Sequence, residues 1–221
     1  MRITILCSSP EHPVNQTLHS WLEARKSQHD VTLVRKKDDL VGGDILFLIA
    51  CTEIIKSKER SLFKKCLVVH ASNVPQGRGW SPHIWQIVSG AEHIVVSLLE
   101  AEDNVDTGAI WKQETIHVPK DALWDEINSL LFQAQIRLMD FAVENYATVV
   151  PAAQSKDRTP TYYPRRTPED SRIDPSMTIG EQFDLIRVCD PVRFPAFFII
   201  HGRKYFLRIE KAVEGERHGG S

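Results

Sequence analysis

The sequence predicts an α/β fold with a mainly parallel sheet that helices cover on both faces. Uninterrupted apolar runs alternate with stretches of helical character, and such runs are typical of strands buried on both faces. The runs expected as buried strands are 3–7, 31–34, 45–50 and 66–69. Two segments rich in β-branched residues, 93–99 and 110–118, are expected to add two later strands.

The helices are predicted from apolar residues that recur at helical spacing. The first covers 15–28 and is expected to be capped by its first residue, an asparagine. A helix-like turn is expected at 52–53, and short helices at 59–65 and 82–88. The longest helix is expected over 120–147. Its apolar stripe consists of Leu123, Ile127, Leu130, Leu131, Ala134, Leu138, Phe141 and Ala142.

A domain boundary is expected near residue 150, because Pro151 and the polar residues 154–161 interrupt regular structure. The first domain then covers 1–150, and a C-terminal extension covers 151–221. The extension is expected to hold a short helix at 178–187, a β-hairpin with strands at 196–200 and 204–209, and a disordered end at 218–221. The apolar first strand of the hairpin makes a homodimer an expectation.

The overall charge gives no case for binding bulk nucleic acid or a membrane surface, since 27 basic and 29 acidic residues leave a net charge of −2. No apolar run approaches the length of a membrane span, and the apolar start is too short for a signal peptide. A cytoplasmic protein is therefore expected. The four widely spaced cysteines, Cys7, Cys51, Cys66 and Cys189, are interpreted as buried reduced thiols, and the nine histidines lack metal-ligand spacing.

The chemistry is expected between residues 66 and 111. The apolar run 66–69 is followed by His70, at the start of an irregular loop that contains Asn73. A second apolar run, 94–99, is followed by the turn Asp106-Thr107-Gly108. If the two runs are neighbouring strands, their carboxyl ends bring His70 and Asp106 together. A carboxylate beside an imidazole orients it for proton transfer. On spacing alone, a structural histidine and a turn-capping aspartate explain the same residues.

Taken together, this stretch resembles the formyltransferases that use N10-formyltetrahydrofolate. That family shares an Asn-x-His motif after a strand, a loop with Pro and Gly, and an Asp-x-x-Asp-Thr-Gly turn. The matching pieces are H-A-S-N-V-P-Q-G-R-G-W-S-P and D-N-V-D-T-G-A-I. The resemblance implies a Rossmann-like fold, with His70 as acid/base and Asp106 as its partner. No metal is implied.

The motif departs from the family at one position. The family asparagine lies two residues before the histidine, where this chain has Val68. That asparagine helps to polarise the formyl oxygen. Asn73 is the polar residue close enough in sequence to replace it, although a turn residue is the alternative interpretation. Otherwise a loop N–H or His70 itself must serve.

The resemblance also implies where the folate lies. One wall is expected from Ile49, Cys51, Thr52, Glu53, Ile54 and Ile55, with backbone groups facing the pterin. The turn that contains Asp103 and Val105 is expected to close the other side. Cys51 is interpreted as pocket lining and not as a nucleophile.

The loop V-V-H-x-S-x-x-P-x-G-x-G-W-S-P and the tail segment Y-P-R-R-T-P-E-D-S-R-I-D resemble bacterial sugar-nucleotide N-formyltransferases of the pseudaminic-acid pathway type. The implied acceptor is the amine of a nucleotide-linked 4-amino-4,6-dideoxy sugar, with UDP favoured over dTDP. The residues expected at the acceptor are Arg78, Gly79, Trp80, Tyr163, Arg165 and Arg166. Guanidinium groups suit a pyrophosphate, although a solvated basic pair and core aromatics are the plain alternatives.

Other members of the family fit the sequence less well. Methionyl-tRNA formyltransferases carry a larger C-terminal domain and a basic surface, and glycinamide ribonucleotide formyltransferases carry a glycine-rich loop after the first strand. Formyltetrahydrofolate hydrolases carry an N-terminal regulatory extension. A catalytically impaired protein that binds folate or nucleotide sugar, suggested by Val68, and a formyltransferase with a different amine acceptor stay open.

Overall fold

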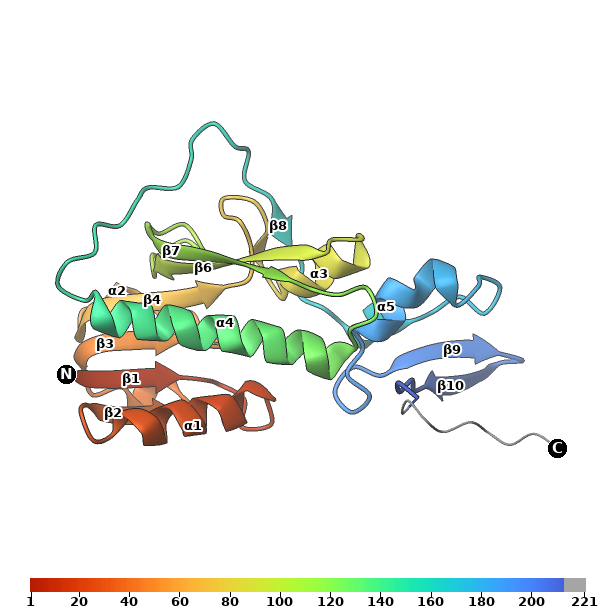
Figure 1. The fold of residues 1–221 in the computed structure, drawn as a ribbon, viewed down its shortest axis with the longest axis horizontal. Coiled ribbons are helices and arrows are strands. Elements are labelled where there is room, and N and C mark those ends of the chain that lie inside the picture. The colour runs from red at the N-terminus through yellow and green to blue at the C-terminus, as the bar shows by residue number, and fades with distance from the viewer. Residues whose placement is uncertain (213–221) are drawn as a thin grey trace.

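The computed structural model describes residues 1–212, so the end expected to be disordered lies outside the described residues. A six-stranded sheet with order β2-β1-β3-β4-β6-β7 forms the body of the molecule (Figure 1). Its strands are β1 (Arg2–Leu6), β2 (Asp30–Val34), β3 (Gly43–Leu48), β4 (Phe63–His70), β6 (His93–Glu100) and β7 (Ile110–His117). The predicted α/β class with a mainly parallel sheet is confirmed.

One strand of the sheet, β6, runs against the others. The strands β1 to β4 are parallel to their neighbours, whereas β6 is antiparallel to both β4 and β7. His70 pairs with Ser97, and Leu67 pairs with Glu100, so β6 ends beside the middle of β4. The expectation that His70 and Asp106 meet at the carboxyl ends of two neighbouring strands is therefore wrong. The loop after β6 must bring Asp106 back to His70.

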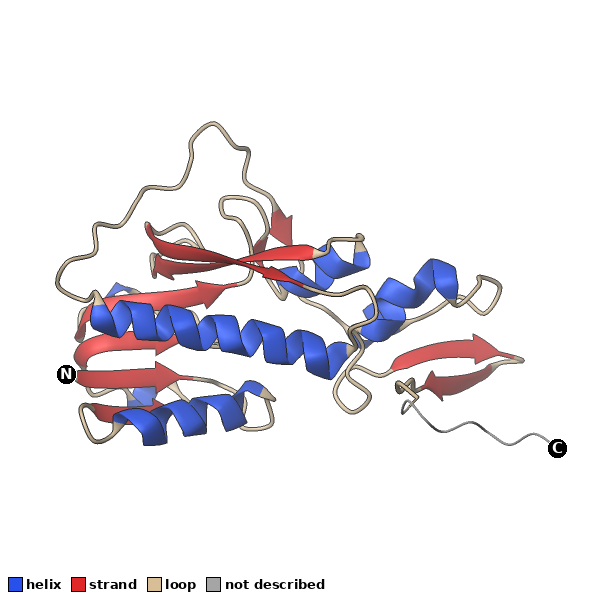
Figure 2. Cartoon of the chain, in the orientation of Figure 1, coloured by secondary structure: helices blue, strands red, loops and turns tan. Residues whose placement is uncertain are grey.

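Two helices cover one face of the sheet. The helices α1 (Val14–Arg25) and α4 (Trp124–Glu144) pack together over the main core, which includes Ile5, Phe47 and Leu67 (Figures 1 and 2). Asp140 of α4 joins them, because it accepts hydrogen bonds of 2.6 Å from both Trp21 Nε1 and Arg25 Nη2. A smaller apolar cluster covers part of the opposite face. Its buried members are Leu6, Leu40, Leu46, Leu48, Ile55, Phe63 and Cys66.

Three local expectations differ from the structure. Residues 52–53 are not helical, and α2 covers only Ser57–Arg60. The strand β4 begins at Phe63, which pairs with Gly43, so the helix expected at 59–65 gives way to tertiary strand pairing. Asn15 lies inside the first turn of α1, where its Nδ2 donates to three carbonyl oxygens of the preceding loop.

The chain after residue 150 first returns to the N-terminal body. The short strand β8 (Tyr162–Tyr163) pairs in parallel with β5 (Arg78–Gly79), next to α3 (Pro82–Val88). The remaining elements project to one side (Figure 1). They are the 3₁₀ helices η2 (Pro168–Ser171) and η3 (Gly180–Gln182), the helix α5 (Phe183–Arg187) and the hairpin of β9 (Ala196–Ile200) and β10 (Arg203–Leu207). The expected boundary near residue 150 stays a prediction, since contacts cross it.

One buried arginine anchors this extension. Arg187 is 1% exposed, and its Nη1 donates to the carbonyl oxygens of Pro119 and Ala122 at 3.0 and 3.2 Å. Its Nε donates to Asp184. The extension is therefore attached at the N-terminal end of α4. In the described part of the chain, none of the helices has the length and apolarity that a membrane crossing requires.

Candidate active site

The histidine of the site is presented by the pleat of β4. Leu67 and Val69 point into the main core, whereas Cys66 and Val68 pack in or against the smaller cluster on the other face. Because side chains alternate along a strand, His70 shares the face of Cys66 and Val68. It lies at the end of β4 and is 7% exposed.

The loop after β4 fixes one nitrogen of the imidazole. His70 Nε2 lies 2.8 Å from the carbonyl oxygen of Gly77. A carbonyl oxygen only accepts hydrogen bonds, so the network assigns the hydrogen of this contact to Nε2. The loop includes a cis peptide bond between Val74 and Pro75. It curls back over the strand that carries the histidine.

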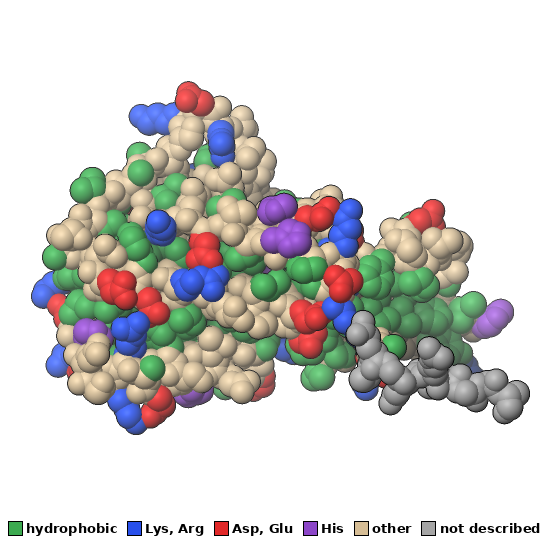
Figure 3. All heavy atoms as spheres, viewed as in Figure 1, with side chains coloured by type: hydrophobic (Ala, Val, Ile, Leu, Met, Phe, Trp, Pro, Cys, Tyr) green, Lys and Arg blue, Asp and Glu red, His purple; other side chains and the backbone are tan. Residues whose placement is uncertain are grey.

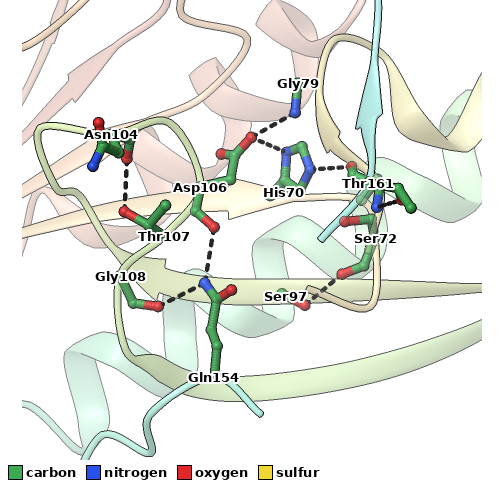
Figure 4. Close-up of polar contacts among 12 residues, drawn as sticks. His70, Ser72, Gly79, Ser97, Asn104, Asp106, Thr107, Gly108, Gln154 and Thr161 are labelled. Carbon is green, nitrogen blue, oxygen red and sulfur yellow. Dashed lines mark hydrogen bonds and ion pairs between the residues drawn. The ribbon is translucent and has the colours of Figure 1, made fainter. Parts of the chain in front are cut away.

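Asp106 approaches the other nitrogen, as Figure 4 shows. Its Oδ2 lies 3.5 Å from His70 Nδ1 and accepts a hydrogen bond of 2.9 Å from the backbone N–H of Gly79. Asp106 is 9% exposed and has a φ of +56°. Aspartate is among the few non-glycine residues that adopt this left-handed conformation, and strained backbone of this kind clusters at functional sites. The structure therefore brings together the predicted pair His70 and Asp106.

Two glycines allow this convergence. A Cβ on Gly108 would lie 1.9 Å from the carbonyl oxygen of Glu100, so only glycine lets the loop after β6 fold back against the end of its own strand. Gly79 has a φ of +96°, and a Cβ there would lie 2.4 Å from the carbonyl oxygen of Tyr163. A side chain at either position would displace the backbone that holds Asp106.

Gln154 stabilises the aspartate loop, and sequence reasoning missed it. Its Nε2 donates to the carbonyl oxygens of Asp106 and Gly108 at 2.8 and 2.9 Å (Figure 4). Its Oε1 accepts from Arg78 Nη2 at 2.6 Å. Gln154 comes from the polar segment after the expected domain boundary, and no motif marks it. Only the return of the chain to the sheet shows its role.

A cavity of about 490 Å³ lies beside the pair. It is lined by residues of three segments, 78–80, 104–107 and 162–163. Its wall includes the predicted acceptor residues Arg78, Gly79, Trp80 and Tyr163, together with Val105. Val105 is expected at the folate, so the two expected ligand regions adjoin here. A neighbouring cavity of about 470 Å³ shares Arg78 with it.

The predicted acceptor arginines separate. The guanidinium of Arg165 lies 5.0 Å from the ring centroid of Trp80, at the rim of the 490 Å³ cavity. Arg166 donates to Ser171 Oγ at 3.0 Å and faces the ring of Phe194, so it lies within the extension. Tyr163 stacks on Trp85 at 6.3 Å. Arg165 and Tyr163 are thus near the cavity, and Arg166 is bound elsewhere.

Asn73 lies in the loop but faces β7. Its Oδ1 accepts a hydrogen bond of 3.3 Å from Gln113 Nε2, and no hydrogen bond joins it to His70 or Asp106 among residues 1–212. Three loop amides already have partners: Gly77 N donates to Thr161 Oγ1, Arg78 N donates to Thr161 O, and Gly79 N donates to Asp106. The Nδ2 group of Asn73 is therefore a remaining donor of this loop.

The expected folate wall contains buried and exposed residues. Ile49 and Ile55 are buried in the two apolar clusters, whereas Thr52 and Ile54 are exposed. Glu53 is half-buried and accepts a hydrogen bond from the backbone N–H of Lys37 at 3.2 Å. The exposed residues are the ones placed to touch a ligand.

Arg60, which sequence reasoning also missed, joins the two expected folate walls. Its Nη1 donates to the carbonyl oxygen of Ile55, and its Nη2 donates to Asp103, each at 2.8 Å.

The thiol of Cys51 is half-buried, and burial raises its pKa. A raised pKa keeps this thiol protonated at neutral pH, which agrees with pocket lining. Cys7, Cys66 and Cys189 are buried free thiols.

A second histidine, His83 of α3, lies near the site. Its pKa is lowered to about 3, mainly by burial and to a smaller extent by Coulomb repulsion from His12, Arg166 and His70. Burial likewise lowers the pKa of His12 to about 4. Both rings are neutral at physiological pH. Within residues 1–212, no group of three or more His, Cys, Asp or Glu residues is placed to hold a metal ion.

The sequence profile described as Formyl transferase matches residues 5–139, which include His70 and Asp106. The chain belongs to the formyl transferase family. Curated relatives are methionyl-tRNA formyltransferases. The protein of Streptococcus gordonii is 24% identical over 186 residues, which are 81% of this chain and 58% of that protein. The protein of Rickettsia bellii is 27% identical over 182 residues, which are 80% and 58%. The chain spans less than two thirds of these relatives.

Several solved structures share the fold. A methionyl-tRNA formyltransferase from Clostridium thermocellum superposes with a TM-score of 0.81 at 21% identity, over 98% of this chain and 95% of that one. A likely sugar N-formyltransferase from Mycobacterium tuberculosis gives 0.75 at 19% identity, over 96% and 98%. HypX from Aquifex aeolicus in complex with tetrahydrofolic acid gives 0.75 at 20% identity, over 92% and 36%. At these identities the likeness establishes the fold alone.

Proposed function

We propose that this protein transfers a formyl group from N10-formyltetrahydrofolate to a primary amine. The observation that carries the proposal is the buried His70–Asp106 pair beside the 490 Å³ cavity, within a member of the formyl transferase family. The amine attacks the formyl carbon, the new C–N bond forms, and the bond from that carbon to N10 breaks. The proton lost by the amine moves through His70 to N10, and tetrahydrofolate leaves.

His70 must change one contact to do this. Both ring nitrogens face acceptors, Gly77 O on one side and Asp106 on the other. For His70 to take the proton of the amine at Nε2, the Gly77 contact must open when substrates bind and the ring hydrogen must lie on Nδ1, facing Asp106; catalytic contacts often rearrange on substrate binding. Asp106 then stabilises the imidazolium. Placing the two substrates side by side supplies much of the rate.

Asn73 is proposed to polarise the formyl oxygen in place of the residue missing at Val68. Three loop amides have internal partners, whereas the Oδ1 contact to Gln113 leaves the Nδ2 group of Asn73 to donate. The folate is proposed to lie between the segment 51–55 and the turn that holds Asp103 and Val105. Arg60 joins these walls.

The proposed acceptor is a nucleotide-linked 4-amino-4,6-dideoxy sugar, with UDP as the nucleotide. Support comes from the sequence resemblance and from the cation and aromatic groups at the cavity, Arg78, Trp80, Tyr163 and Arg165. Rings of this kind stack on a base or sugar, and a guanidinium pairs with phosphate. The structure from Mycobacterium tuberculosis described as a likely sugar N-formyltransferase has the same fold.

Methionyl-tRNA is the second candidate acceptor. The curated relatives are methionyl-tRNA formyltransferases, and the structure from Clostridium thermocellum has that description too. The net charge of −2 argues against it, since tRNA binding calls for a basic surface.

The deciding experiment measures formyl transfer by mass shift. The purified protein is incubated with N10-formyltetrahydrofolate and either UDP-linked 4-amino sugars or methionyl-tRNA. His70→Ala is expected to reduce kcat by about 10²–10⁴-fold, the range for general acid–base groups. The exposed His19→Ala serves as the matched control and is expected to keep full activity. Binding of folate and nucleotide sugar without any transfer would instead identify a catalytically impaired binding protein.

The hairpin is proposed to form a homodimer interface. Ile199, Ile200, Tyr205 and Phe206 are between 39% and 60% exposed on a two-stranded sheet. Figure 3 shows apolar side chains gathered over this part of the molecule. Phe206→Lys is expected to shift the mass measured by light scattering from dimer to monomer. A monomeric wild-type protein would contradict this proposal.

A further inference from the structure

The 470 Å³ cavity carries positive charge and no carboxylate. It lies between the segment 153–160 and the backbone that holds Asp106. The polar side chains in its wall belong to Arg78, Thr107, Gln154, Ser155, Lys156 and Arg158. Three of these are cations, and no aspartate or glutamate is in the wall. A cavity with this lining favours an anion over a neutral or cationic ligand.

Arg78 is the central group because it is a buried cation without a counter-charge. It is 9% exposed and forms no ion pair with a carboxylate anywhere in residues 1–212. Its Nη1 donates to the hydroxyl of Tyr162 at 3.1 Å and its Nη2 to Gln154 Oε1 at 2.6 Å, both neutral acceptors. Its Nε has no hydrogen-bond partner within the described chain. Burying an unpaired charge is unfavourable, so an anion near Arg78 would offset that cost.

The segment over the cavity is fixed at both ends. Ala152 exchanges two backbone hydrogen bonds with Ile110 on β7, at 2.7 and 2.8 Å. Thr161 binds the loop after β4 through Gly77 N and Arg78 N. Between these ends the chain arches from the end of α4 to β8 (Figure 1). The exposed Lys156 and Arg158 in this arch line the cavity together with Arg78.

We infer that this cavity is a phosphate subsite for the acceptor, formed by Arg78, Lys156 and Arg158. The inference rests on the proposed function and specifies its substrate class as amines that carry a phosphoryl or diphosphoryl group. The 470 and 490 Å³ cavities share Arg78 and Thr107, so one ligand can occupy both. Its phosphate then lies under the arch, and its amine lies toward His70.

The binding test uses UDP and inorganic pyrophosphate as probes, by calorimetry at one fixed low salt concentration. The double variant K156A/R158A is expected to weaken the binding of both probes by about tenfold or more, as expected for loss of charge-assisted contacts. The matched control K112A/R208A removes the same charge from two exposed positions outside the cavity. Its affinities are expected to stay within about twofold of wild type, because distant exposed charges are screened.

Several outcomes would overturn the inference. Equal weakening in the control would mean bulk electrostatics, and weakening of UDP alone would mean that the cavity contacts the nucleoside. Absence of binding of both probes to the wild-type protein would also overturn it. So would binding of a short RNA acceptor-stem hairpin without binding of either probe, which points to a nucleic acid.

The inference and the proposed function fail separately. The binding test needs no formyl donor. Phosphate binding without formyl transfer to any acceptor would therefore support the phosphate subsite and contradict the proposed activity. If transfer occurs, K156A/R158A is expected to raise KM for the phosphorylated acceptor about tenfold. It is expected to leave kcat unchanged, because these cations do not touch the reacting atoms. A fall in kcat at an unchanged KM would contradict a phosphate subsite.

Discussion

In the N-terminal body the functional side chains are buried and held by backbone contacts, whereas in the extension the apolar side chains of the hairpin are exposed. His70 and Asp106 are less than 10% exposed, while Phe206 is 60% exposed. The body is thus arranged before any ligand arrives, and the extension presents a surface that a partner can still cover. The proposed chemistry therefore depends on the body, and the proposed dimer depends on the extension.

Some residues cross this division. Arg187 anchors the extension on the carbonyl groups before α4, and Gln154 holds the loop of Asp106 from beyond residue 150. The body and the extension therefore differ in how exposed their side chains are, but they are joined by specific hydrogen bonds. Variants at these residues test the difference between the body and the extension.

The largest expected effect on stability is at the anchor. Arg187→Ala is expected to lower the free energy of unfolding by about 3 kcal/mol, because the buried carbonyl oxygens of Pro119 and Ala122 lose their donor. Urea unfolding measures it. The control Arg172→Ala removes an exposed pair with Glu169 in the same extension and is expected to cost less than about 1 kcal/mol. Equal losses would mean that Arg187 is no anchor.

The loop of the site is tested next. Asn73→Ala is expected to reduce kcat by about 100-fold at nearly constant stability, the effect of removing one oxyanion donor. Steady-state kinetics and thermal unfolding give the two readings. The control is Gln113→Ala, which removes the observed partner of Asn73 and keeps its amide. Near-normal activity of Asn73→Ala would leave the formyl oxygen to His70.

Gln154→Ala tests whether the segment after residue 150 positions the catalytic pair. About a tenfold loss in kcat is expected, because two hydrogen bonds that fix the Asp106 loop are removed. The pH profile of kcat should change as well, because the carboxylate beside His70 is displaced. Gln133→Ala, on the exposed face of α4, is the control. An unchanged pH profile would show that Gln154 acts on folding alone.

A pH dependence of stability is also expected. The pKa of His83 is lowered to about 3 and that of His12 to about 4, from an ordinary value near 6.5. The unfolded chain therefore takes up protons first, so stability is full above pH 6.5 and falls as the pH drops toward 4. At pH 5.5 the loss relative to pH 7.5 is expected to be about 1.4 kcal/mol for each histidine, or about 3 kcal/mol for the two together. Calorimetry at pH 7.5 and 5.5 measures it, and His83→Gln should flatten the slope while the exposed His19→Gln should not.

The strands of the main sheet, the long helix, the hairpin and the proximity of His70 to Asp106 could be predicted from the sequence alone. Apolar periodicity and the motif around these two residues carry that information locally. The sequence did not determine that β6 runs antiparallel, because periodicity identifies a strand and is silent on its direction. It did not show Gln154 or Arg60 either, because their roles depend on contacts with residues that are distant in the chain.

The way in which the motif forms a site depends on long-range folding. A loop folded back at Gly108 brings Asp106 to His70, where two strand ends had been expected to do so. The fold also separates two neighbouring arginines: Arg165 lies at the cavity, whereas Arg166 faces the extension. The physical reason is the same in each case. Residue type fixes what a side chain can do, and long-range packing and backbone pairing fix what it meets.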